Sequence, residues 1–181
     1  PSQAAEKKLA VIENRSIGFR KKDVTAVARI IADVKKNGDD ALVSYTRRFD
    51  SPGMQKSALK VSAEEIKAAP TQVDRAFVRA LNRAARQVSH FHRQQRPSSW
   101  INVERPGTLL GQIVRPVDTA GIYVPGGSAP LFSTVLMLAV PAVLAGCKEI
   151  VLCSPPRKDG TLHPAIIWAA KEAGVTHICK S

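Results

Sequence analysis

Residues 120–127, Ala-Gly-Ile-Tyr-Val-Pro-Gly-Gly, form the stretch of this 181-residue chain that decides its fold. Five mostly apolar residues predict a buried strand, and the Pro-Gly-Gly turn predicts its abrupt end. An apolar helical segment from about Ser133 to Ala145 follows, and we expect Pro141 to split it. Strand runs over 149–153 and 175–179 flank a second helix over 164–172. This β-α-β-α-β order predicts a parallel, doubly wound sheet of the α/β class.

The residues before this unit are predicted to be mainly helical. One helix carries an apolar stripe at helical spacing, with Asp23 expected as its N-cap and Gly38 as its end. The stripe consists of Val24, Val27, Ile31 and Val34. A second helix is expected over about 40–49. A capping box, Ser62 with Glu65, then opens a short helix that Pro70 ends.

Two short β elements are expected in the same half of the chain. Residues 58–61 are a strand candidate, and residues 100–114 predict a hairpin around the turn Arg105-Pro106-Gly107. We therefore predict a helical region over residues 1–106 that includes the start of this hairpin. The second predicted domain, over residues 107–181, is a partial Rossmann-like domain that ends after its third strand. Parallel sheets are normally covered on both faces, so this sheet is expected to be incomplete.

Charge is the unusual feature of the composition, with 27 Lys and Arg against 15 Asp and Glu and a net charge of +12. Residues 1–106 hold 21 basic and 11 acidic groups, whereas residues 107–181 hold 6 and 4. The longest predicted helix, over about 71–95, carries an arginine stripe opposite its apolar stripe. The stripe consists of Arg75, Arg79, Arg83 and Arg86. It indicates either a solvated face or a polyanion-binding face, but no aromatic platforms or nucleic-acid motif accompany it.

The turn after Tyr123 is the most informative candidate site. It lies at the carboxyl end of a predicted strand and before a helix, which is where open α/β sheets bind ligands. Gly126 and Gly127 would let the backbone approach a ligand closely, and amides near a helix start suit phosphate. The dinucleotide fingerprint G-x-G-x-x-G is absent, so a tight strand-to-helix connection explains the turn equally well.

No catalytic or metal site is predicted within this chain. The four histidines form no ligand spacing, and no Ser or Cys lies in a nucleophile motif. The three cysteines, Cys147, Cys153 and Cys179, are expected to be buried, reduced thiols of a cytoplasmic protein. Residues 1–20 contain no signal peptide, and the longest apolar stretch is too short to cross a bilayer. The chain opens on Pro1 instead of Met, which favours a processed product or a piece of a longer protein.

Residues 115–156, from Arg115-Pro-Val-Asp-Thr-Ala-Gly-Ile-Tyr-Val-Pro-Gly-Gly to Leu-Cys-Ser-Pro-Pro156, closely resemble the signature stretch of histidinol dehydrogenase. Residues 34–50 and 59–66 resemble the same family. The resemblance implies oxidation of L-histidinol to L-histidine through histidinal, with reduction of two NAD, by a zinc-containing homodimer. It also implies an architecture related to aldehyde dehydrogenases. Tyr123 matches a tyrosine that contacts NAD, so the implied cofactor-binding residues are Tyr123, Pro125, Gly126 and Gly127.

The resemblance covers only the N-terminal portion of the family. The family's Glu-His catalytic pair and its zinc ligands, which are Gln, His, Asp and His, match nothing in this chain. We therefore expect the 181 residues alone to be inactive, and the resemblance implies neither membrane nor nucleic-acid binding. The alternative is a non-catalytic, truncated paralogue that binds nucleic acid or another polyanion through its basic face.

Overall fold

The computed structural model describes residues 2–13, 20–126 and 130–181. Its backbone contacts divide the chain into two compact units, Pro1–Ala41 and Leu42–Ser181. The second unit includes residues on both sides of position 106. The domain boundary that the sequence predicts at residues 106 and 107 stays a prediction.

The first unit contains helices α1 (Gln3–Glu13) and α2 (Lys21–Asn37). The predicted N-cap of α2 is wrong, because the helix begins two residues before Asp23 and Arg20 occupies the cap position. Asp23 lies in the first turn instead, where its carboxylate accepts a bond of 2.7 Å from Arg20 Nε. An acidic residue there is favourable because it complements the positive end of the helix dipole. Gly38 ends α2 as predicted, with φ +58° and its N–H donating to the Val34 carbonyl.

Helix α3 (Asp39–Phe49) begins in the first unit and continues into the second, where α4 (Ala63–Ala68) follows. The predicted capping box is confirmed: Ser62 Oγ accepts from the Glu65 N–H, and Glu65 Oε2 accepts from the Ser62 N–H. Short 3-10 turns lie at η1 (Lys56–Ala58) and η2 (Ala69–Gln72), so Pro70 falls just after α4. The predicted strand over 58–61 is wrong, because only one bridge forms there, between Lys60 and Cys179.

Helix α5 (Arg75–Arg93) begins four residues later than predicted because Asp74 caps it. The Asp74 carboxylate accepts a bond of 3.2 Å from the Ala76 N–H. The apolar stripe of α5 faces α6, and the Phe77 ring meets the Phe132 ring edge to face at 4.7 Å. The arginine stripe lies on the opposite side and is exposed throughout.

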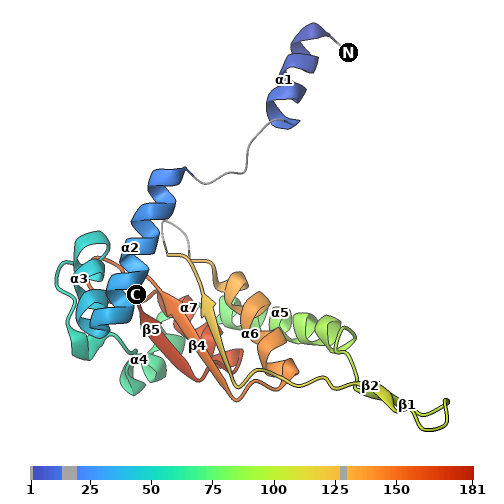
Figure 1. Cartoon of the computed structure of the whole chain (residues 1–181). Helices are drawn as coiled ribbons and strands as arrows, with labels where there is room; N and C mark the ends of the chain where they lie inside the picture. The colour runs from blue at the N-terminus through green and yellow to red at the C-terminus, as the bar shows by residue number, and fades with distance from the viewer. Residues whose placement is uncertain (1, 14–19, 127–129) are drawn as a thin grey trace. The chain divides into compact units, whose positions relative to one another are not determined.

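A parallel sheet of order β3-β4-β5 organises the second unit, which confirms the predicted α/β fold class (Figure 1). Its strands are β3 (Thr119–Tyr123), β4 (Glu149–Ser154) and β5 (His177–Lys180). Helices α6 (Phe132–Ala145) and α7 (Pro164–Glu172) connect them and pack against each other. Both helices pack into one hydrophobic core with Ile150 and Leu152 of β4, so they cover the same face of the sheet. Burial alternates accordingly, with Ile150 and Leu152 buried and Val151 and Cys153 half-buried.

Helix α6 runs unbroken through Pro141, so the predicted split is wrong. A proline removes one backbone donor, but the helix keeps its remaining bonds and buries Val135, Leu136, Ala139 and Val140 in the core. The cysteines also differ from the prediction, because all three thiols are only half-buried. None of the helices in the described part of the chain is long and apolar enough to cross a bilayer.

A two-stranded antiparallel ribbon, β1 (Trp100–Asn102) and β2 (Leu110–Gln112), confirms the predicted hairpin. Its turn is stabilised by the Thr108 N–H donating to the Arg105 carbonyl, with Gly107 at φ +75°. Every residue of both strands is exposed. In Figure 1 the ribbon lies away from the three-stranded sheet.

Candidate ligand site at the carboxyl ends of β3 and β4

A hollow of about 480 Å³ opens where β3 and β4 end. Pro125 and Gly126 follow β3, and Ser154, Pro155 and Pro156 follow β4. The remaining lining comes from the end of α3, the residue Pro130 before α6, the loop after β4 and the start of α7. These residues are Phe49, Asp50, Pro130, Arg157, Lys158, Leu162, His163 and Ile166. The hollow thus lies at the edge where parallel α/β sheets bind ligands.

Gly126 is required by the close approach of the two strand-end loops. A Cβ atom at this position would lie 2.7 Å from Pro155 Cγ and 3.2 Å from the Pro155 carbonyl oxygen. Both distances are shorter than ordinary van der Waals contact, so a side chain would push the loops apart. The sequence predicted a glycine that admits a ligand. The structure shows that the absence of a side chain at Gly126 lets the loop around Pro155 pack against it.

The other residues predicted to bind a cofactor lie in different places. Pro125 is half-buried and lines the hollow. Tyr123 is 58% exposed at the end of the edge strand β3 and does not line it. Between them, Val124 is fully buried, and its N–H donates to the Cys153 carbonyl. Gly127 lies outside the described residues.

The charged residues of the hollow come from segments that the sequence did not connect. Asp50 directly follows α3, whereas Arg157 and Lys158 lie in the loop after β4. A bond of 3.3 Å from Ser51 Oγ to the Lys158 carbonyl joins these two segments. Burial raises the pKa of the Asp50 carboxyl group, because desolvation disfavours its charged form.

His163 links the hollow to helix α7. Its Nδ1 accepts a bond of 3.1 Å from the Ala165 N–H, so the unprotonated nitrogen caps the helix. Desolvation lowers the pKa of His163, and the positive charge of Arg157 lowers it further. The Arg157 guanidinium is itself held by the Leu162 carbonyl, at 3.1 Å. The site therefore combines a fixed cation with a neutral imidazole.

The arrangement suits a ligand with an anionic group, polar hydroxyls and a flat apolar part. Arg157 and Lys158 supply cations, Asp50 supplies an acceptor, and the prolines and Phe49 supply apolar walls. Sequence reasoning missed these residues because it treated only the first strand end as a site. The same rule applied to Ser154-Pro155-Pro156 would have pointed to Arg157 and Lys158.

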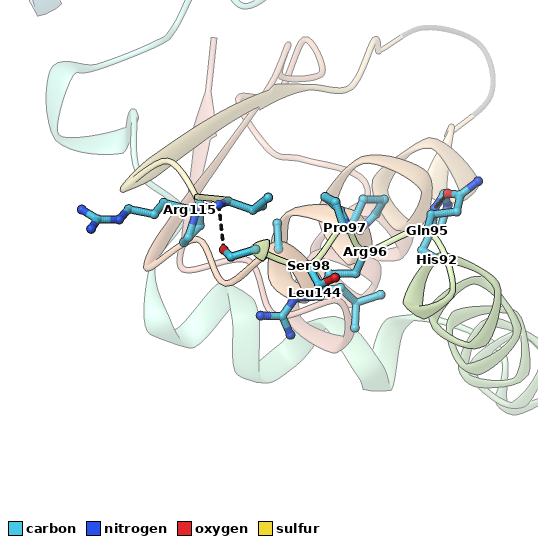
Figure 2. A pocket seen from close by; sticks show the side chains of 12 residues that line it. His92, Gln95, Arg96, Pro97, Ser98, Arg115 and Leu144 are labelled. Carbon is cyan, nitrogen blue, oxygen red and sulfur yellow. Dashed lines mark hydrogen bonds between the residues drawn. The ribbon is translucent and has the colours of Figure 1, made fainter. Parts of the chain in front are cut away.

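A second hollow, of about 560 Å³, lies away from the strand ends (Figure 2). The end of α5 and its following segment, the stems of the ribbon and the end of α6 line it. Figure 2 shows the Arg115 side chain extending away from the other labelled residues. A hydrogen bond of 2.9 Å from the Val114 N–H to Ser99 Oγ fastens the two stems together. Since neither a strand end nor an acidic side chain borders this hollow, the first one is the stronger ligand site.

Comparison with known proteins identifies the family. The family model for histidinol dehydrogenase matches residues 14–181. The chain belongs to the histidinol dehydrogenase family. A histidinol dehydrogenase from Symbiobacterium thermophilum is 42% identical over 172 residues, which are 95% of this chain and 39% of that relative. One from Carboxydothermus hydrogenoformans is 48% identical over 152 residues, or 84% of this chain and 36% of the relative.

A solved histidinol dehydrogenase agrees with the fold. The crystal structure of the enzyme from Elizabethkingia anophelis matches with a TM-score of 0.86 and 37% identity. The match covers 100% of this chain and 41% of that chain. The present chain thus spans about two fifths of the length of the histidinol dehydrogenases it matches, and it corresponds to an N-terminal portion of them.

The described residues offer no site for zinc. Within residues 2–13, 20–126 and 130–181, no group of three or more His, Cys, Asp or Glu side chains could hold a metal ion. Structural and catalytic zinc sites need at least three such protein ligands.

Proposed function

We propose that this chain forms part of the NAD-binding half of a histidinol dehydrogenase. The parent enzyme would oxidise L-histidinol to L-histidine through histidinal, as a cytoplasmic, zinc-dependent homodimer that reduces two NAD. The observation that carries the proposal is the hollow at the carboxyl ends of β3 and β4. Its position, its cations and its apolar walls suit one part of a dinucleotide.

Different residues of the hollow would contact different parts of NAD. Lys158 and Arg157 would face the pyrophosphate, because guanidinium and ammonium groups bind phosphate oxygens well. The Asp50 carboxylate would accept from ribose hydroxyls. Pro125 and the Gly126 backbone would border the cofactor, and Tyr123 and Gly127 would contact it beyond the hollow. Bound NAD would supply the hydride acceptor of the reaction.

The histidine of the hollow is not free for the chemical step. Oxidation of an alcohol needs a base that takes the hydroxyl proton as hydride leaves. His163 is occupied as the cap of α7, and no metal cluster exists among the described residues. We therefore propose that the 181 residues bind cofactor without turning over L-histidinol, and that the remainder of a full-length enzyme supplies the missing groups.

Titration calorimetry with NAD tests the proposal. The wild-type chain is expected to bind NAD, and Lys158→Ala is expected to weaken binding about tenfold because one phosphate contact is lost. Lys148→Ala is the matched control, since Lys148 is exposed at the opposite end of β4. Equal affinities for all three proteins would contradict the site. Sustained NADH production from L-histidinol, by a sample of verified mass, would contradict the inactivity.

One observation favours the alternative of polyanion binding. The α5 arginine stripe, Arg75, Arg79, Arg83 and Arg86, is exposed throughout. No ion pair joins these arginines to any described carboxylate. Salt-dependent binding of a DNA or RNA duplex, abolished when the four arginines are replaced by serine, would support this alternative.

A further inference from the structure

The β1–β2 ribbon carries a cluster of aliphatic side chains on one face. Strand alternation and the register Ile101 opposite Gly111 place Ile101, Val103, Leu109 and Ile113 on one side, here called the apolar ribbon face. Trp100, Asn102, Leu110 and Gln112 fall on the other, mixed side, where Trp100 Nε1 donates to Gln112 Oε1 at 3.3 Å. The aliphatic side chains of the ribbon are therefore concentrated on one face, with Leu110 alone on the other.

Nothing in the second unit covers the apolar ribbon face. Its four side chains are between 64% and 69% exposed. Patches of large aliphatic side chains on soluble proteins mark interaction surfaces, and an isolated two-stranded ribbon is marginally stable in water. The ribbon is nevertheless well defined, because Val114 N–H bonds to Ser99 Oγ and Glu104 N–H bonds to Asn102 Oδ1. A preformed, uncovered apolar surface needs a partner.

We propose that the apolar ribbon face docks onto the part of a histidinol dehydrogenase that follows the portion matched by this chain. The larger part of each matched relative lies outside the match, since the Symbiobacterium relative is covered to only 39%. The solved relative keeps the fold of this whole chain at a TM-score of 0.86 while carrying that additional polypeptide. This proposal rests on family membership and is independent of NAD binding.

A covalently attached remainder is favoured over a second copy of this chain. In a full-length relative the remainder is held at a high effective concentration, so it covers the ribbon at any protein concentration. A second copy would have to associate from solution and would compete with the remainder for the same face. The opposite side of the ribbon, with the polar side chains of Asn102 and Gln112, stays available to water in either case.

Co-expression tests the docking directly. The tagged chain is expressed with the part of the Symbiobacterium thermophilum relative that follows its matched residues, and the two are co-purified. The wild-type chain is expected to retain the partner in a 1:1 complex. Ile101→Ser with Leu109→Ser is expected to weaken retention at least tenfold, whereas Leu110→Ser on the opposite face leaves it unchanged. Equal retention by all three chains would overturn the proposal.

Hydrogen exchange supplies a second measurement that does not require the partner to fold alone. Amides of the ribbon are expected to exchange at least a hundredfold more slowly in the intact Symbiobacterium enzyme than in this chain. Equally fast exchange in both would overturn the proposal. Sedimentation velocity of the chain alone decides between occupants. Concentration-dependent dimers that Ile101→Ser with Leu109→Ser removes would assign the face to a second copy instead and overturn the proposal.

Discussion

The three-stranded sheet and the two-stranded ribbon are built from similar residues but reach opposite states. In the sheet, Ile150, Leu152 and Ile178 are at most 4% exposed because α6 and α7 cover them. In the ribbon, Ile101, Leu110 and Ile113 are 64–68% exposed. The difference teaches that strand-forming sequence sets the local backbone, whereas burial depends on what lies above the strand.

The largest expected effect is a difference in stability between two Leu→Ala variants, one in the three-stranded sheet and one beside the ribbon. Leu152→Ala in the centre of β4 removes a fully buried side chain and is expected to destabilise the chain by about 3 kcal/mol. Leu109→Ala, at 69% exposure beside β2, is expected to change stability by less than about 0.5 kcal/mol. Urea unfolding measures both. Similar losses would mean that the ribbon is packed in solution.

The next effect concerns the buried ion pair that closes the β5 side of the sheet. Lys180 Nζ is 2.7 Å from Glu65 Oε1, with side chains 5% and 30% exposed. Glu65→Ala leaves the ammonium buried without a partner and is expected to cost about 2 kcal/mol, because the pair is partly solvated. Glu65→Gln keeps a neutral acceptor and is expected to cost less in the same urea experiment. A larger loss for Gln than for Ala would contradict the buried-charge explanation.

A smaller effect is expected at the junction of the strand-end loops. Gly126→Ala places a Cβ against Pro155 and is expected to cost about 1 kcal/mol. Gly121→Ala is the control on β3, because no atom lies within 4 Å of its added Cβ. Thermal unfolding compares the two. Equal melting temperatures would show that the Pro155 loop moves away from the added Cβ with no loss of stability.

The smallest effect is a pH dependence at α7. The folded pKa of His163 lies below its unfolded value of 6.5, so the unfolded chain binds the proton more readily. The contribution of His163 to stability is therefore complete above the unfolded pKa and is lost as pH falls toward the folded pKa. His163→Ser, which also caps helices, is expected to flatten the stability profile between about pH 7 and pH 5. If the slope of stability against pH is the same in His163→Ser, the pH dependence in this range arises from other groups.

Local sequence rules predicted most of the fold. The alternating β-α order, Gly38 as a helix end and the Ser62–Glu65 capping box follow from short-range chemistry, and the structure confirms them. The failures required tertiary knowledge. Pro141 is tolerated because α6 is held in the core, and residues 59–61 pair with β5 through a single bridge. At the candidate site, chain folding alone brings Ser51 to Lys158 and places Asp50 and Lys158 around one hollow, which no motif spacing reveals.

The two edges of the sheet differ in whether their backbone hydrogen-bonding groups are already paired, and this decides where a further strand can be added. The outer edge of β5 is occupied, since the Val61 N–H bonds to the Ile178 carbonyl and the Lys180 N–H bonds to the Leu59 carbonyl. In the described part of the chain, β3 has a strand on one side only. The β5 edge is therefore closed to a further strand, whereas the β3 edge is open to one. Such a strand would reverse the strand order next to Tyr123 and turn the exposed end of β3 into the wall of a crevice.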